Sequence, residues 1–339
     1  MQCLCAFIDL HAGARGLSPI SLQFRHGMRH YEEFPVPLER EIPTLPPRQT
    51  LLGQVDIFVT NIWPLFPAVD RVDLEADIDR LLEIQGPEPR GLKEKIAAKD
   101  LPGLAVMYAI ACIGIDEKAS RVTEESMRYL KACYGLSAHI TGMPYLKSVQ
   151  ALFLLALALH GQARDGQAWY VVGQAIRLAQ SLGLHKRLPA SAQGGYRAND
   201  DLHRRLWWSC FSLEKLLQLE CGRPSSTCHG DFDRALPALP SMASEDGPPD
   251  YFSPWVALAG IMGRISDRLY SRNFSSSEEM FLETCALDQA LLEWDRRLPE
   301  SLRPRCDGLA HLEEGSHSVL ANFLSQQYFS VSQHPKALS

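Results

Sequence analysis

The chain has 339 residues, and its 34 Lys and Arg against 40 Asp and Glu give a formal net charge of −6. This balance excludes a protein that binds nucleic acid by bulk positive charge alone, because such a protein needs a basic chain or a basic stripe. Hydrophobic residues make up 46% of the chain and charged residues 22%, which is typical of a globular fold and excludes a wholly disordered chain.

Cysteine usage and hydropathy indicate the compartment. Nine cysteines are too few for a disulfide scaffold of this length, and none has the Cys-x-x-Cys spacing of a metal site, so we expect buried free thiols. The first ten residues lack the basic region of a secretory signal. The apolar stretch 151–159 is far shorter than the roughly 20 residues that cross a bilayer. The sequence therefore predicts a protein of the cell interior that does not enter a membrane.

The first half of the chain changes from irregular to helical patterns. Residues 10–49 include Pro35, Pro37, Pro43, Pro46 and Pro47, which exclude a helix or a central strand there. From Leu51 apolar residues recur every three or four positions, as on one helix face, until Pro64 ends the pattern. A second short pattern ends at Gly86. Further helices are predicted over 104–115 and 120–134.

The second half holds the clearest helices. Residues 146–160 are apolar on nearly all sides, which predicts an enclosed helix, and 167–182 are amphipathic, with Gly183 at a left-handed C-terminal cap. After a predicted loop over 185–199, Asn199 is expected to cap a helix that ends at Cys221, with Asp200 and Asp201 in its first turn.

The last predicted helices span about 255–270 and 278–298, the second opened by a capping box of Ser276 and Glu279. Gln327, Tyr328 and Phe329 look like the start of one more helix, which we expect to be cut off by Pro335. No segment shows the alternation of a strand. The predicted fold is therefore all-α: an irregular multi-helix bundle of about nine or more helices with long Pro- and Gly-rich loops.

The sequence contains none of the common motifs of enzyme active sites, nucleotide-binding sites or metal sites. There is no glycine-rich phosphate loop, no nucleophile elbow and no His-Glu-x-x-His. His26 and His30 are four residues apart, but nothing near them indicates a helix, so we interpret them as surface residues rather than metal ligands. We interpret the short basic segments 185–187 and 203–205 as solvated faces or salt-bridge anchors. The sequence predicts no enzyme, no metal and no cofactor.

Three segments carry a family pattern. Residues 202–224 read LHRRLWWSCFSLEKLLQLECGRP, an arginine–tryptophan helix that runs into a Gly-Arg-Pro turn. Residues 148–155 and 168–185 form a helix pair that ends in Leu-Gly-Leu-His, and 58–74 contain the proline-rich Trp-Pro-Leu-Phe-Pro. Together, over about 50–305, these segments resemble the middle homology region of fungal zinc-cluster transcription factors. The residues that carry the first match are Arg204, Arg205, Trp207, Trp208, Gly222, Arg223 and Pro224.

Elementary chemistry gives these motif residues a structural role. We expect Arg204 and Arg205 to begin their helix, the two tryptophans to fill volume between helices, and Gly222 to permit the backbone reversal. Arg223 is then held at the turn, where it can satisfy helix-end carbonyls or a carboxylate such as Asp231 or Asp233. In this interpretation the motif residues hold neighbouring segments together and maintain the fold, and they do not contact a ligand.

The chain also departs from the family pattern. The resemblance implies an N-terminal zinc cluster held by six cysteines, through which members of this family bind DNA. In this chain only Cys3 and Cys5 lie near the N-terminus. We therefore divide the chain into an irregular segment 1–49, a regulatory domain 50–305 and a truncated tail 306–339. Genuine loss of the zinc cluster and truncation of the gene model both remain open.

The resemblance implies a nuclear regulator of transcription that restrains or relays activation on binding a small molecule or a partner protein. Without the zinc cluster, we expect contact with DNA to be indirect, through DNA-bound transcription factors or co-regulators. The alternative is a cytoplasmic ligand- or protein-binding module, a scaffold or a decoy, without a transcriptional role. That alternative predicts an apolar pocket among the helices 104–115, 146–160 and 200–221.

Overall fold

The computed structural model describes residues 42–87, 91–186, 196–227, 232, 249–304 and 316–336, all within the compact unit Arg40–Ser339. His26, His30, Cys3 and Cys5 lie outside these residues. The described residues form eleven α-helices and no strand, which confirms the predicted all-α class. The helices are α3 (Arg48–Asn61), α4 (Arg71–Gln85), α5 (Gly91–Lys95), α6 (Leu101–Ala119), α7 (Glu124–Thr141), α8 (Leu146–Gly161), α9 (Asp165–Ser181), α10 (Tyr196–Cys221), α11 (Phe252–Ile265), α12 (Ser277–Arg297) and α13 (Ser316–Lys336).

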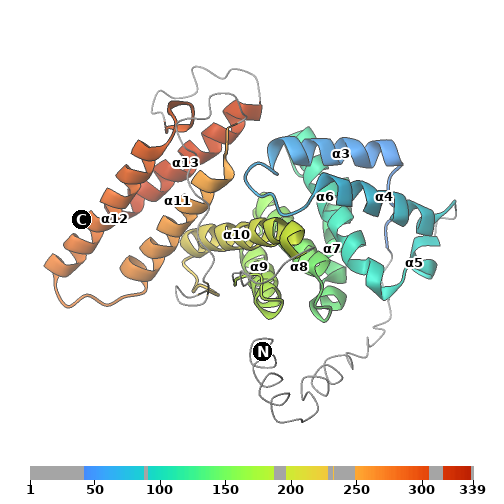
Figure 1. Ribbon diagram of the computed structural model, residues 1–339, viewed down its shortest axis with the longest axis horizontal. Helices are drawn as coiled ribbons and strands as arrows, with labels where there is room; N and C mark the ends of the chain where they lie inside the picture. The colour runs from blue at the N-terminus through green and yellow to red at the C-terminus, as the bar shows by residue number, and fades with distance from the viewer. Residues whose placement is uncertain are drawn as a thin grey trace, which may run out of the picture. The chain divides into compact units, whose positions relative to one another are not determined.

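The helix α10 connects two groups of helices within this unit (Figure 1). It packs against α8 and α9 on one side and against α11 on the other. The helix α6 packs against α3, α7 and α8, while α12 and α13 pack against α11 and against each other. The arginine–tryptophan helix α10 therefore packs against the helix pair that precedes it in the chain.

The two most apolar helices, α6 and α8, form the core. Every residue of α6 from Leu101 to Gly114 is buried, and so is every residue of α8 from Ser148 to Leu159. The segment Ala98–Ala119 is long and apolar enough to cross a membrane, but 78% of its most apolar window is buried inside the fold. This burial is what the core helix of a packed helical domain requires.

Helix ends follow most of the predicted signals. Gly183 and Gly222 have φ values of +79° and +60°, so both adopt the left-handed conformation that ends a helix. The Ser276 hydroxyl accepts from the Glu279 amide, as predicted. The Glu279 carboxylate reaches the amide of Ser275 rather than that of Ser276, so only half of the predicted capping box forms.

Predicted bounds are wrong at several helices. The helix expected over 120–134, for example, is α7, Glu124–Thr141. The helix α10 begins at Tyr196, so Asn199 lies inside it and Asp201 lies beyond its first turn. The carboxylate of Asp201 binds arginine side chains of its own helix instead of the backbone. The helix α13 begins at Ser316, far before Gln327, and it continues through Pro335 to Lys336.

Candidate functional site

Arg205 ties α10 to the segment that follows α3. Its guanidinium donates at 2.7 Å to each of three oxygens: the carboxylates of Asp201 and Asp70, and the carbonyl of Pro67. Its guanidinium carbon also lies 5.9 Å from the ring centre of Trp63. Two of the segments that carry the family resemblance therefore meet at this one side chain.

Arg204 lies beside Arg205 but makes far fewer contacts. Its guanidinium pairs with Asp201 at 2.6 Å and is 40% exposed, whereas the Arg205 side chain is 14% exposed. Both arginines lie well inside α10, which corrects the expectation that they begin the helix. Because the helix begins at Tyr196 and not after Asn199, the two arginines lie in its interior turns.

Trp207 and Trp208 are both fully buried. The ring of Trp207 lies near His185 and Phe232, and that of Trp208 lies near Phe211 and Phe232. Neither indole N–H has a hydrogen-bond partner among the described residues. The two rings therefore act through their volume and aromatic contacts rather than through their polar groups.

The turn after α10 closes onto the start of α9. The Arg223 guanidinium donates to the carbonyl of Gly166 at 3.3 Å and lies 5.0 Å from the ring centre of Trp169. The Trp169 indole in turn donates to the carbonyl of Pro224 at 3.2 Å. The acceptor of Arg223 is thus in the first turn of α9 rather than at a helix C-terminus. The other predicted acceptors, Asp231 and Asp233, lie outside the described residues.

A buried ion pair that the sequence analysis did not predict lies on α10, on the side that faces this turn. The side chains of Glu214 and Lys215 are 0% and 3% exposed, and their charged atoms are 3.1 Å apart. The Lys215 ammonium also donates to Gln218 at 3.2 Å and to Ser225 at 2.5 Å, so all three of its donors are used. Glu214 accepts from the Ser226 amide at 2.5 Å. The signal that could have revealed the pair is a Glu-Lys dipeptide between buried leucines.

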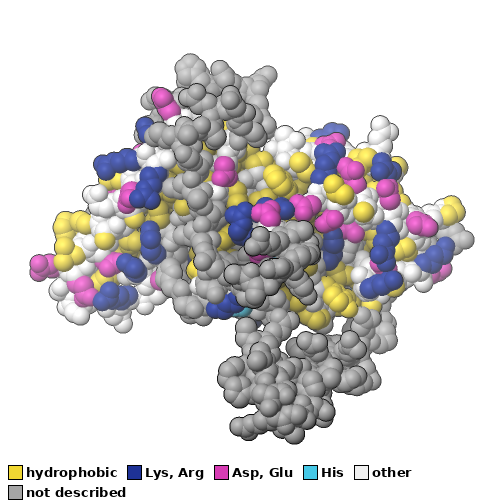
Figure 2. All heavy atoms as spheres, viewed as in Figure 1, with side chains coloured by type: hydrophobic (Ala, Val, Ile, Leu, Met, Phe, Trp, Pro, Cys, Tyr) yellow, Lys and Arg dark blue, Asp and Glu magenta, His cyan; other side chains and the backbone are white. Residues whose placement is uncertain are grey.

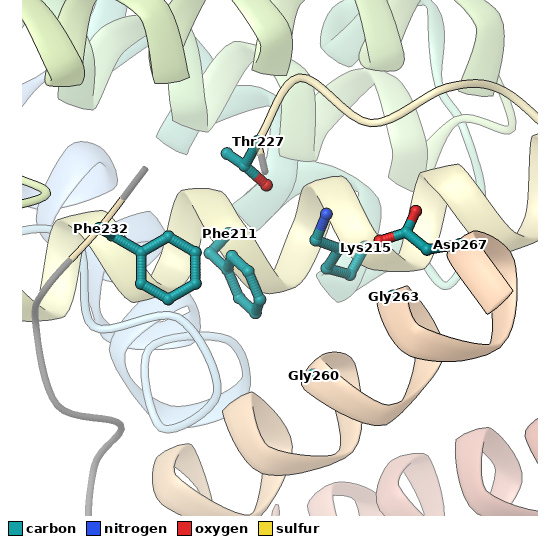
Figure 3. A pocket seen from close by; sticks show the side chains of 7 residues that line it. All are labelled: Phe211, Lys215, Thr227, Phe232, Gly260, Gly263 and Asp267. Atoms are coloured by element: carbon teal, nitrogen blue, oxygen red, sulfur yellow. The ribbon is translucent and has the colours of Figure 1, made fainter. Parts of the chain in front are cut away.

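The space around Lys215 is nearly filled (Figure 3). Phe211 and Lys215 of α10 face Gly260 and Gly263 of α11 across a void of about 10 Å³, which holds at most one water molecule. A Cβ at Gly263 would lie 2.8 Å from Cδ of Lys215, so the glycine lets the two helices approach. This site has no room for an organic ligand.

A larger cavity of about 280 Å³ lies among α3, α6, α8, α10 and α13. Its lining includes residues of all three helices between which the ligand-module hypothesis expects a pocket: Ile113 of α6, Leu157 of α8 and Leu216 of α10. Most of the lining is apolar, and Asp116, Glu117 and His160 supply its titratable polar groups. Cys112 also lines the cavity, and burial raises the pKa of its thiol to about 12, which keeps the thiol neutral.

One group of side chains in the described part of the chain could hold a metal ion. Nδ1 of His160 lies 2.8 Å from a carboxylate oxygen of Asp165, and ligand atoms of these two residues and Glu220 lie within 4.8 Å of one another. Desolvation raises the pKa of Glu220; Asp165 adds to this shift and His160 opposes it. We assign no metal here, because Glu220 is exposed and no fourth ligand belongs to the group. The three residues come from the ends of three helices, so sequence spacing could not bring them together.

Charges of both signs are mixed over the surface. Figure 2 shows Lys and Arg side chains next to Asp and Glu side chains on the described parts of the visible face. Ion pairs of exposed side chains in the described part of the chain include Arg48 with Asp79 and Arg272 with Glu279. The described part of this face therefore presents no continuous basic stripe of the kind that binds a nucleic-acid backbone.

Comparison with known proteins gives a family. The model of the "Fungal specific transcription factor domain" matches residues 55–300. The chain is 30% identical over 213 residues to an ABC-transporter-regulating transcription factor of Aspergillus oryzae, covering 60% of this chain and 23% of that protein. No solved structure matches the chain.

Two yeast proteins cover more of the chain at lower identity. An uncharacterized transcriptional regulatory protein of Schizosaccharomyces pombe is 23% identical over 265 residues, which is 74% of this chain and 33% of that protein. A putative transcriptional regulatory protein of Saccharomyces cerevisiae is 24% identical over 300 residues, which is 80% of this chain and 38% of that protein. The chain thus spans less than two fifths of the length of each of these relatives. Because the family match spans well over half of the chain, the chain belongs to the fungal specific transcription factor domain family, a family of transcription regulators and not of enzymes.

Proposed function

We propose that the chain acts in the nucleus as the regulatory domain of a transcription regulator of the fungal zinc-cluster type. The observation that carries this proposal is the family match over residues 55–300. The relatives described above are each named as regulators of transcription, which supports the same assignment. We place the regulatory domain at 50–305 and add α13 to it, because α13 packs against α3, α11 and α12.

The domain reaches DNA through DNA-bound transcription factors or co-regulators rather than by its own contacts. The net charge of −6 of the chain and the mixed charges on the described part of the face in Figure 2 support this, because phosphate contacts need clustered Lys and Arg.

The motif residues maintain the fold in this proposal. Arg205 and Arg223 each join α10 or its turn to another segment, and the tryptophans fill the space between helices. Gly222 supplies the left-handed turn, while Arg204 and Pro224 make one polar contact each. A small-molecule effector would bind elsewhere, and the cavity of about 280 Å³ offers the room for it.

The same cavity favours a second candidate function, a ligand-binding module without a transcriptional role. Such a module needs the apolar pocket that the described residues form. It differs from the first candidate in its location, which would be cytoplasmic, and in having no effect on a promoter.

A promoter-tethering experiment separates these candidates. We would fuse residues 1–339 to an unrelated DNA-binding domain, express the fusion in a fungal host, and measure a reporter with the cognate sites. The first candidate predicts a several-fold change against the DNA-binding domain alone, together with nuclear localisation of the tagged chain. Reporter output equal to that of the DNA-binding domain alone, from a fusion that is stably expressed, would contradict it.

The DNA contact is tested separately. Purified chain should show no tight binding to duplex DNA, so the binding isotherm should lack the steep salt dependence of phosphate neutralisation. Tight binding with a steep salt slope would overturn the assignment of indirect contact.

A further inference from the structure

We propose that the cavity of about 280 Å³ binds an organic cation, namely a protonated amine on an apolar body of about a dozen non-hydrogen atoms. The inference deepens the proposed function, because it names the chemical class of the effector for the site suggested above. It rests on the size, the charge, the hydrogen-bonding groups and the aromatic rings of the lining.

The volume sets the size of the ligand. A cavity of roughly 150 Å³ holds one benzene ring. This cavity is about twice as large, so it accommodates a ring with a short chain but no large polycyclic molecule. Side chains of Ile113, Leu157 and Leu216 give the body of the ligand an apolar surface to cover.

The charge of the lining selects a cation. Asp116 and Glu117 both line the cavity, and no Lys or Arg does so among the described residues. Neither carboxylate forms an ion pair with a described residue, and the imidazole of the lining, His160, pairs with Asp165 instead. Two carboxylates without a cationic partner attract a cation and repel an anion.

The carboxylates are held in place by neutral donors. Asp116 accepts from Gln162 Nε2 at 2.8 Å and from the Thr123 amide at 3.3 Å. Glu117 accepts from the side-chain amide of Asn61 at 3.4 Å. These bonds orient the carboxylates without neutralising them, so the negative charge remains for a ligand.

Aromatic rings complete the lining. Phe66 and Phe323 line the cavity, and both rings are fixed by edge-to-face contacts with the buried Trp255. Aromatic faces attract a desolvated cation and also pack against an aromatic body. Both parts of an arylalkylamine thus find a complementary surface in one cavity.

Three probes with one apolar body test the proposal: 4-phenylbutylamine, 4-phenylbutanol and 4-phenylbutyrate. Their heads are cationic, neutral and anionic, and titration calorimetry on the purified full chain measures each dissociation constant. We expect the amine to bind about tenfold or more tightly than the alcohol, and the carboxylate to bind most weakly. Equal affinities for the amine and the alcohol, or no binding by any probe, would overturn the proposal.

Matched variants locate the cation. Asp116→Asn and Glu117→Gln each remove one charge with little change in shape, and each should lower the preference for the amine while the affinity for the alcohol stays. Glu83→Gln removes an exposed carboxylate on α4 and should change neither. Retained alcohol binding shows that a variant is folded. An unchanged amine preference in both Asp116→Asn and Glu117→Gln would refute the assignment.

Failure of this inference and failure of the proposed function give different results. The titration uses purified chain and no promoter, whereas the tethering experiment uses a promoter and no added amine. A chain that changes the reporter but shows no preference for the amine loses the ligand assignment alone. A chain that prefers the amine but leaves the reporter unchanged loses the regulatory assignment alone.

Discussion

Two regions of the molecule hold charged side chains beside an internal space, one of them buried and the other partly open to solvent, and only the buried one is neutralised by the protein itself. Around Lys215 and Glu214 the two charges pair with each other, and a void of about 10 Å³ remains. Around Asp116 and Glu117 two carboxylates border a cavity of about 280 Å³ without a cationic partner among the described residues. The first region therefore supports the fold, while the second is where we propose that a ligand binds.

The largest effect is expected at the buried ion pair. Lys215→Met leaves Glu214 buried without its counter-charge, and breaking one partner of a buried pair costs about 3–5 kcal/mol. Urea unfolding followed by circular dichroism measures the loss of stability. Lys131→Met changes an exposed lysine of α7 and should stay within about 0.5 kcal/mol. Equal losses in the two variants would mean that the pair is not buried in solution.

The next largest effect is expected at Arg205, and the neighbouring Arg204 should contribute much less to stability. Arg205→Ala removes three hydrogen bonds that involve a charge and should cost about 2–3 kcal/mol, because Arg205 joins α10 to Pro67 and Asp70. Arg204→Ala removes one exposed ion pair and should cost less than about 1 kcal/mol. Urea midpoints of the two variants measured side by side provide the test. A larger loss for Arg204→Ala would overturn the assigned roles.

Alanine substitutions at two glycines of α11 should change the stability of the fold in opposite directions. Gly263→Ala places a Cβ 2.8 Å from Cδ of the firmly bound Lys215, so overpacking should cost about 1–3 kcal/mol. Gly260→Ala meets no atom within 4 Å and should stabilise the helix by about 0.5–1 kcal/mol. Thermal unfolding should give a lower melting temperature for Gly263→Ala and a higher one for Gly260→Ala than for the unchanged chain. Stabilisation by Gly263→Ala would show that α10 and α11 are farther apart than described.

The smallest expected effect depends on pH. Desolvation raises the pKa of Glu220, so the native state binds its proton more tightly than the unfolded state does. The stability that this carboxyl contributes is present below its unfolded pKa and is lost as pH rises through the native pKa. Glu220→Gln should therefore stabilise the fold near neutral pH by no more than about 0.5 kcal/mol. Below both pKa values the effect should vanish, and melting temperatures across this pH range test both parts.

Helix periodicity was sufficient to predict the inner helices. The enclosed helix predicted over 146–160 is α8, Leu146–Gly161, because a core helix has apolar residues on every side. The start of α10 could not be obtained in this way. Asn199 and the acidic pair after it look like a cap, but the Asp201 carboxylate binds arginines one turn farther along the helix instead.

The candidate site was predicted less completely than the fold. The ligand-module alternative indicated three of the helices that line the pocket, α6, α8 and α10, but not α3 and α13. It could not assign different contacts to Arg204 and Arg205, since only the tertiary fold places Pro67 and Asp70 beside one of them. No sequence motif singled out Asp116 and Glu117, because the residues of α3, α8, α10 and α13 that line the same cavity lie far from them in the chain.

One matched pair of substitutions tests the contrast between the two regions most directly. Glu214→Gln and Asp116→Asn each replace a carboxylate by its amide, and urea unfolding measures both. The first should lose about 3 kcal/mol or more, because Lys215 is left without its counter-charge, and the second less than about 1 kcal/mol, because no cation depends on Asp116. Equal losses, or a larger loss for Asp116→Asn, would contradict the account.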